Sequence, residues 1–192
     1  MRTRRTVCAL AVASMVGLAG CTEAIPTRGS DAEDDRRREV LARYEDAMGE
    51  RNDGIETRDQ AIERFNAAAY AEATDEMETA LEHLSTAADG FEGAAEAIET
   101  AEGTETAEGT ETDEGTAADD LSAAREICVD AAANTRLQVE ATEAGLAAAR
   151  AADDDEDAET INDHVEEYQL LVEEAEARPV ADGETLADVL GF

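Results

Sequence analysis

The sequence contains no tryptophan and no lysine, and it has few cysteines, prolines and histidines. All 15 basic residues are arginines, and they stand against 49 acidic residues, so the net charge is −34. A chain this acidic is repelled by nucleic-acid phosphates and cannot bind anionic lipid headgroups through a polybasic segment. The composition therefore argues against nucleic acid as a partner. It favours loose, nonspecific association of cations with an acidic surface.

Cysteine is too scarce for a disulfide framework. Two of the three cysteines, Cys8 and Cys21, lie in the first 21 residues, which leaves Cys128 alone in the rest of the chain. We therefore expect no internal disulfide, even in an oxidising compartment. Because Cys128 continues an apolar stripe, it is expected to be a small core residue rather than a nucleophile.

The two histidines do not define a metal site. Di-iron sites in helical bundles use Glu-x-x-His pairs, but Ala80 and Ile161 stand three residues before His83 and His164. A site built from both histidines and Cys128 is conceivable only if folding brings the three together. No serine-based triad pattern, phosphate-binding loop or dinucleotide fingerprint is present. We expect no enzyme activity, no catalytic residue and no cofactor.

A run of five acids, residues 153–157, resembles the start of a calcium-binding loop. It departs from the EF-hand pattern because Ala158 replaces the required glycine and His164 stands where a bidentate glutamate is needed. We interpret the run as a solvated turn whose acids suit the positive end of a following helix.

The N-terminal segment has the layout of a secretory signal. Arginines at positions 2, 4 and 5 precede an apolar run over residues 7–20, followed by small residues at a cleavage position. The apolar run has 14 residues, fewer than the roughly 20 that a membrane-spanning helix needs. Residues 1–20 are therefore predicted to be a signal peptide.

The stretch Leu18-Ala19-Gly20-Cys21 resembles the lipobox of exported lipoproteins. This resemblance implies that the Cys21 thiol carries lipid and becomes the first mature residue, at the outer face of the cytoplasmic membrane. The alternative is an ordinary cleaved signal with Cys21 as an incidental thiol. Arg4 and Arg5, with Thr3 before them, also resemble the twin-arginine export signal, although Cys8 departs from its apolar pattern and leaves Sec export open.

The excess of acidic residues indicates that the protein is exposed to concentrated salt. Removal of residues 1–20 takes away three arginines and no acids, which leaves the mature chain at −37. Self-repulsion of that size destabilises a compact state, but at about 1 M salt the Debye length is only about 3 Å. Abundant acids, absent lysine and many alanines resemble the proteins of extreme halophiles, particularly haloarchaea. Disorder, the alternative explanation of high charge, does not fit the segments with regular apolar spacing.

Helical periodicity begins after a short tether, residues 21–30. Ser30 and Glu33 have capping-box spacing, and a stripe of apolar residues follows at Val40, Leu41, Tyr44, Ala47 and Met48. The turn-forming sequence Asn52-Asp53-Gly54 predicts the end of this first helix. A second capping box, Thr57 to Gln60, predicts the start of the next.

Two long stripes follow, and their spacing of 3 and 4 residues is that of a coiled coil or bundle seam. Gly90 and Gly93 fall within the earlier stripe, where we expect a kink or break. The stripes comprise Met77, Leu81, Leu84, Ala88, Phe91, Ala95 and Ile98, and then Leu121, Ala124, Cys128, Ala132, Thr135, Val139, Thr142, Leu146 and Ala149.

Residues 102–116 between these stripes form a six-residue Glu-Gly-Thr repeat. With no aliphatic residue larger than alanine, the repeat cannot offset the entropy of ordering, and it is predicted to be a flexible loop. Its simplest origin is an expanded connector. An O-glycosylated patch on its threonines (Thr104, Thr106, Thr110 and Thr112) is the alternative.

The remaining elements are short. Ile161, Val165, Tyr168, Val172 and Ala175 predict a fourth helix, which Pro179 should close at Arg178. Asp182-Gly183 begins a last helical turn that carries Leu186, Val189 and Leu190.

No segment shows a convincing two-residue period, so the predicted fold is all-α over residues 31–192: an elongated antiparallel helical bundle, or coiled-coil-like hairpin, with two shorter flanking helices. We expect a four-helix end and a two-helix arm tipped by the repeat. The expected role is a non-catalytic, membrane-anchored scaffold that docks an envelope partner or self-associates. The alternative is a ligand- or cation-binding accessory lipoprotein.

Overall fold

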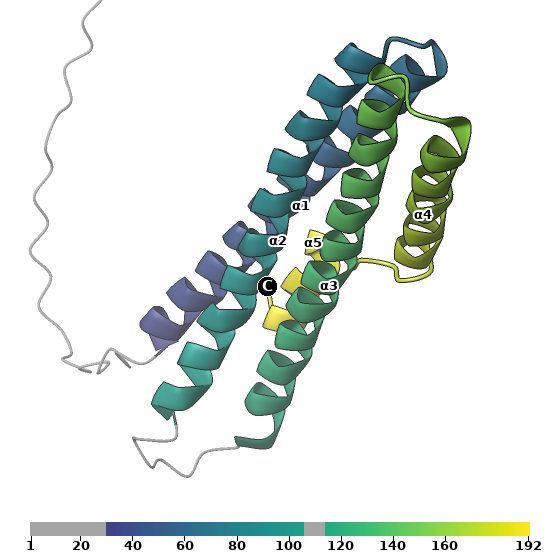
Figure 1. Cartoon of the computed structure of the whole chain (residues 1–192). Coiled ribbons are helices and arrows are strands. Elements are labelled where there is room, and N and C mark those ends of the chain that lie inside the picture. The colour runs from purple at the N-terminus through teal and green to yellow at the C-terminus, as the bar shows by residue number, and fades with distance from the viewer. Residues whose placement is uncertain (1–29, 106–113) are drawn as a thin grey trace, which may run out of the picture.

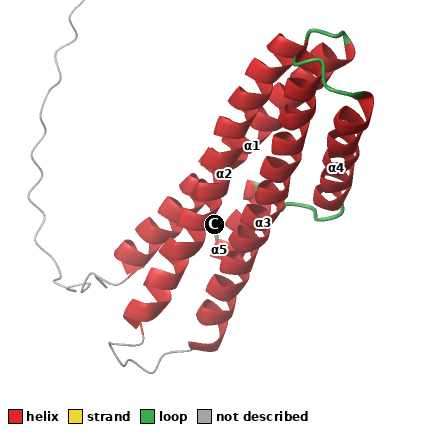
Figure 2. Cartoon of the chain, viewed as in Figure 1, coloured by secondary structure: helices red, strands yellow, loops and turns green. Residues whose placement is uncertain are grey.

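The computed structural model of the chain describes residues 30–105 and 114–192, which fold into five helices. No strand occurs within these two ranges (Figure 2). The helices are α1 (Ser30–Asn66), α2 (Tyr70–Glu105), α3 (Glu114–Asp153), α4 (Ala158–Glu176) and α5 (Gly183–Leu190). The predicted all-α antiparallel bundle is thereby confirmed.

Three long helices form the body. α1, α2 and α3 run up, down and up along one direction, and α2 lies between the other two (Figure 1). The two short helices flank this body at different heights. α4 packs on the C-terminal half of α3, whereas α5 sits between α1 and α3 nearer the end where α1 begins. In the described part of the chain, no helix is both long enough and apolar enough to cross a membrane.

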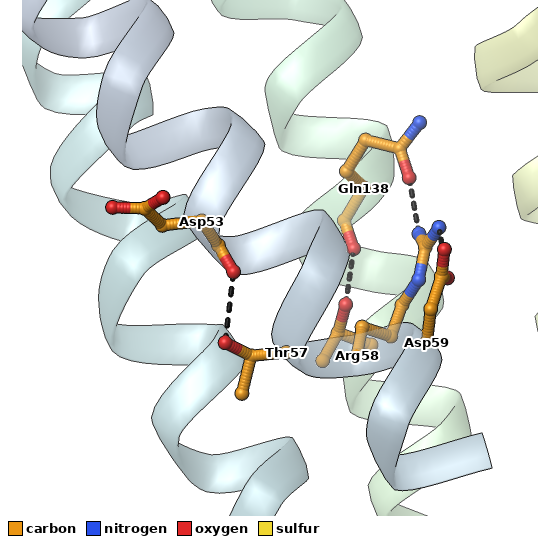
Figure 3. Close-up of polar contacts among 6 residues, drawn as sticks. Asp53, Thr57, Arg58, Asp59 and Gln138 are labelled. Atoms are coloured by element: carbon orange, nitrogen blue, oxygen red, sulfur yellow. Dashed lines mark hydrogen bonds and ion pairs between the residues drawn. The ribbon is translucent and has the colours of Figure 1, made fainter. Parts of the chain in front are cut away.

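The first helix does not end where the sequence predicted. α1 continues through Asn52, Asp53 and Gly54 to Asn66. The Thr57 hydroxyl does not cap a new helix; it donates a hydrogen bond to the Asp53 carbonyl one turn earlier, at 2.8 Å (Figure 3), as threonines inside helices do. The predicted two-helix arm was therefore wrong, because α1 runs beside α2 along nearly its whole length.

Glycines within α1 and α2 allow these helices to approach closely. A Cβ on Gly54 would lie 2.7 Å from Leu84 Cγ, and one on Gly90 would lie 2.9 Å from Ala47 Cβ. Both distances are too short for carbon atoms in contact. Of the kink or break expected at Gly90 and Gly93, the break does not occur, since α2 is a continuous helix there. These glycines serve packing rather than interruption.

The core follows the predicted stripes. Every position of the two long stripes is buried except Leu81 and Val139, which are half-buried. Tyr44 of α1 and Phe91 of α2 pack edge to face in its centre, with ring centroids 4.9 Å apart. Leu186 and Leu190 of α5 complete the same cluster. The short fourth helix and the last helical turn were also correctly predicted.

Two turns at the end opposite the start of α1 hold residues with left-handed backbone. Ala68, between α1 and α2, has φ 58°, and Asp155, between α3 and α4, has φ 54°. The predicted loop over residues 102–116 is wrong at both ends, because residues 102–105 belong to α2 and residues 114–116 to α3. Alanine and glutamate favour helix, so the flanking helices extend into the repeat. Residues 106–113 lie outside the described residues, and the glycosylation alternative remains a hypothesis.

Candidate functional site

The residues predicted to export and anchor the chain lie outside the described part of the structure. They are Arg4 and Arg5 of the export signal, Leu18, Ala19 and Gly20 of the lipobox, and Cys21 as the lipid attachment point. The described body begins at Ser30, nine residues after Cys21. Any site with a defined geometry must therefore be sought in the helices.

The histidines and Cys128 are not brought together. His83 of α2 faces α1, where its Nδ1 lies 2.7 Å from Glu50 Oε2. His164 of α4 has Glu167 of its own helix 4.0 Å away. Cys128 is fully buried in the core of α1, α2, α3 and α5. The three-residue metal site that the sequence left conceivable is therefore not formed.

Burial decides the chemistry of Cys128. It raises the pKa of the thiol from its ordinary value of 9.0 to about 12. A cysteine nucleophile needs its thiolate form, and this thiol stays protonated at neutral pH. Its position fits the expected role of a small core residue.

The acidic turn caps α4, as the sequence suggested. The Asp157 carboxylate accepts hydrogen bonds from the backbone N–H groups of Glu159, at 3.1 Å, and Thr160, at 3.0 Å. These bonds lower the pKa of Asp157, with the Thr160 amide as the largest cause. Within residues 30–105 and 114–192, no group of three or more His, Cys, Asp or Glu side chains is arranged to hold a metal ion.

The most distinctive feature of the interior is a polar seam where α1, α3 and α4 meet. We define the polar seam as Arg51 and Arg58 of α1, Asn134 and Gln138 of α3, and Tyr168 of α4. Arg58, only 5% exposed, crosses from α1 and donates through Nη1 to the Gln138 side-chain oxygen (Figure 3). Its guanidinium also lies over the Tyr168 ring, 5.8 Å from the centroid, within the range of a cation–π contact.

A second bridge of the seam ends on the backbone of α4. Arg51 Nη2 donates to Asn134 Oδ1 at 2.9 Å. Asn134 Nδ2 in turn donates to the carbonyls of Ala175, at 2.6 Å, and Arg178, at 2.7 Å. The last carbonyls of a helix carry partial negative charge. The Asn134 amide therefore couples the negative end of α4 to the cationic Arg51.

The segment after α4 is fastened to α1 as well. The Tyr44 hydroxyl donates to the Ala181 carbonyl at 2.6 Å, and Arg37 Nη1 donates to the Leu190 carbonyl at 3.1 Å. Burial raises the pKa of Tyr44 above its ordinary range, so the hydroxyl remains a donor at any physiological pH. These bonds hold α5 and its preceding linker against the long helices.

The seam is cationic and short of carboxylates. Its one described ion pair joins Arg58 Nη2 to Asp59, at 3.5 Å, and Asp59 is largely exposed. The Nε atoms of Arg51 and Arg58 are buried without a hydrogen-bond partner, and burial lowers the pKa of Arg51. Guanidinium and carboxamide groups neither accept nor release protons near neutral pH. The seam therefore joins α1, α3 and α4 through hydrogen bonds and the Arg58–Tyr168 contact.

A groove lies along the contact between α1 and α2. It has a volume of about 520 Å³. Its lining combines three carboxylates with one arginine, one hydroxyl and small residues: Asp46, Glu50, Asp89, Arg43, Thr86, Ala47, Gly90 and Gly93.

The polar seam was not predicted from the sequence. Arg51 and Arg58 are seven residues apart on α1, and Asn134 and Gln138 are four apart on α3, so each pair shares one helix face. The predicted end of the first helix at residues 52–54 placed Arg51 and Arg58 on different helices. Long polar residues placed in phase with a neighbouring apolar stripe are the signal that would have revealed it.

Comparison of the chain with protein-family models, with curated proteins and with solved structures found no significant match. The class of protein is therefore set by the fold alone: an all-α, elongated, antiparallel helical bundle.

Proposed function

We propose that this protein is an extracytoplasmic lipoprotein, attached to the outer face of the cytoplasmic membrane through lipid on Cys21, and that its bundle is a non-catalytic scaffold that docks an envelope partner. The observation that carries the proposal is Leu18-Ala19-Gly20-Cys21, which closes an apolar run preceded by Arg4 and Arg5. A thioether-linked lipid needs a cysteine thiol, and Cys21 stands directly after the predicted cleavage position.

The shape of the body supports a scaffold role. α1 alone has 37 residues, which at about 1.5 Å per residue extends roughly 55 Å. With α1 beginning nine residues after Cys21, an anchored molecule would present the α1–α2 and α3–α4 turns farthest from the chain's attachment point. An elongated body with a fixed end suits the spacing or presentation of partners.

The interior supports a non-catalytic role. Of its buried polar residues, Arg58, Asn134 and Gln138 join helices, whereas Thr135 and Thr142 donate to carbonyls of their own helix. Cys128 is a protonated core thiol. The acidic composition further supports a brine-exposed location, where salt screens the repulsion among exposed carboxylates.

The anchor is tested with Cys21→Ser, expressed in a halophilic archaeal host. We expect the wild-type chain in the membrane fraction with a lipid-sized mass on Cys21, and the variant in the soluble exported fraction. Cys8→Ser is the matched control, because it changes a cysteine of the same segment and should leave attachment intact. An unmodified Cys21 in a membrane-bound wild-type chain would overturn the proposal.

The docking role is tested by crosslinking in native membranes at high salt. A reproducible crosslinked species that contains a second protein, and that is lost when the bundle is deleted behind an intact anchor, is the expected result. Repeated recovery of the uncrosslinked monomer alone would contradict it.

The alternative, a ligand- or cation-binding accessory lipoprotein, is favoured by one observation. The α1–α2 groove places Asp46, Glu50 and Asp89 around a hollow of about 520 Å³, a volume typical of small-molecule sites. Calorimetry in brine with Mg²⁺, Ca²⁺ and small organic cations tests it. Saturable heat that Gly93→Leu abolishes would support the groove as a site, and the absence of saturable heat would exclude these ligands.

A further inference from the structure

α4 is the least integrated of the described helices. Its backbone comes close to α3 and to no other described helix. Both of its ends are nevertheless fixed. The N-terminal end continues from α3 through the turn at residues 154–157, and the C-terminal end leads to Ala181, which Tyr44 holds. α4 therefore has the position of a strap laid over α3 (Figure 1).

The apolar contribution of α4 is small. Ala175 is its only fully buried residue, and the rest of its stripe is half-buried: Ile161, Val165, Tyr168 and Val172. None of these residues belongs to either of the core clusters formed by the other helices. The hydrophobic free energy that docks α4 is correspondingly modest.

The charge of α4 opposes its docking. Between Ala158 and Glu176 there are seven acids and no arginine or lysine. Among the described residues, the ion pair that involves α4 joins Glu174 to Arg178 of the segment that follows the helix. His164 lies 4.0 Å from Glu167 of the same helix.

α2 and α3, by contrast, are joined by interhelical ion pairs. Arg125 pairs with Glu99, Arg136 with Glu92, and Arg150 with Glu78. The seven carboxylates of α4 all lie at exposed positions. They repel the net negative charge of the rest of the protein, and among the described residues no ion pair joins them to another helix. Salt that screens this repulsion stabilises α4 on α3 more than it stabilises the α2–α3 contact.

We propose that α4 is a salt-controlled strap, docked on α3 in concentrated salt and released when the ionic strength falls, while α1, α2, α3 and α5 stay packed. The range of the repulsion supports this device, because the Debye length grows from about 3 Å at 1 M to about 10 Å at 0.1 M. Release breaks the Asn134 bonds to α4 and the Arg58–Tyr168 contact. It exposes the apolar stripe of α4 and the side of α3 around Gly145, whose Cβ position lies 3.4 Å from the Tyr168 ring.

The test is amide hydrogen exchange of the full chain, followed by mass spectrometry, at about 3 M and about 0.2 M NaCl. We expect exchange of α4 to rise by about tenfold or more at the lower salt, with exchange of the buried centres of α2 and α3 changing by less than about threefold. Joint exchange of all helices at low salt, or an α4 that stays protected, would overturn the proposal.

Charge variants separate release of α4 from an effect of total charge. The α4 variant combines Asp163→Asn, Glu166→Gln, Glu173→Gln and Glu176→Gln, all at exposed positions. The matched control removes four exposed acids from α2: Asp75→Asn, Glu82→Gln, Asp89→Asn and Glu96→Gln. We expect the α4 variant to keep α4 protected at low salt and the control to behave like the wild type. Equal protection of α4 in both variants would show that net charge, not the charge of α4, controls docking.

Discussion

Asn134 stands between Arg51 and the C-terminal end of α4, with its oxygen 2.9 Å from Arg51 Nη2 and its nitrogen 2.6 Å from the Ala175 carbonyl. One carboxamide thus satisfies a cation from α1 and a helix end from α4, and it does so while only 2% exposed. A carboxamide is suited to this position because it carries a donor and an acceptor on one planar group. A carboxylate would neutralise Arg51 but could not donate to the two carbonyls.

Replacement of Asn134 by alanine should therefore be costly. Asn134→Ala removes the acceptor of Arg51 and the side-chain donor to the Ala175 and Arg178 carbonyls, although Ala175 still accepts from the Arg178 N–H group. We expect a loss of about 2–4 kcal/mol in the free energy of unfolding. Denaturant unfolding in high salt, followed by circular dichroism, measures this loss of stability. Asn162→Ala is the control, because Asn162 is exposed on α4 and should change stability by no more than about 0.5 kcal/mol. Equal effects of the two substitutions would contradict the bridging role.

Glycines at different positions of α1 should respond oppositely to alanine. Gly49 has no atom within 4 Å of its Cβ position, so Gly49→Ala should stabilise the protein by about 0.5–1 kcal/mol through helix propensity. At Gly54 the new Cβ would lie 2.7 Å from Leu84 Cγ and 3.2 Å from the Ala80 carbonyl. Gly54→Ala should therefore destabilise by about 1–3 kcal/mol despite the same gain in propensity. The melting temperatures of both variants, measured at one salt concentration, test this prediction. Stabilisation by Gly54→Ala would show that α1 and α2 can separate freely.

Arg58 offers a test of whether the seam stabilises the fold or specifies its arrangement. Arg58→Ala removes the bridge to Gln138 and leaves a cavity, so we expect a loss of about 2–4 kcal/mol. The pair Arg58→Met and Gln138→Leu removes both polar partners and fills the space, and it should be within about 1 kcal/mol of the wild type.

The double variant should nonetheless hold α4 less specifically. A thioether side chain carries no cation to stack over the Tyr168 ring, so amide exchange of α4 should increase while global stability is retained. A double variant as unstable as Arg58→Ala would mean that the buried charge itself stabilises the fold.

The long helices were predictable because their apolar residues repeat every three or four positions without interruption. That spacing located the buried faces of α2 and α3, and it also located α4 and α5. Caps and breakers located the shorter elements, since Asp157, Asp182 and Pro179 act locally through hydrogen bonds or fixed dihedral angles.

The first helix could not be bounded from local chemistry alone. Asn52-Asp53-Gly54 is turn-forming in isolation, but Gly54 lies against Leu84, where packing outweighs the propensity of three residues. The polar seam requires this continuity, because Arg51 and Arg58 share a helix face only if α1 is unbroken between them. Which helices meet across the seam is a matter of tertiary arrangement, and no local pattern encodes it.

Cys128 gives the fold a defined response to alkaline pH. Burial raises the pKa of its thiol to about 12, whereas in the unfolded chain it ionises near its ordinary value of 9.0. The unfolded state then binds fewer protons than the folded state above that value, so stability is fully present at lower pH and falls as the pH rises toward about 12. One such group lowers the free energy of unfolding by about 1.4 kcal/mol per pH unit in this range.

The variant Cys128→Ala isolates this contribution. It lowers stability at about pH 8 by removing a buried sulfur, but it also removes one alkaline-sensitive group. Between about pH 8 and about pH 10, urea unfolding should show the wild type losing about 1.4 kcal/mol more than the variant. The comparison between the two chains cancels the titration of Tyr44, whose pKa is also raised by burial. A parallel decline in both chains would mean that the Cys128 thiol reaches solvent in the folded protein.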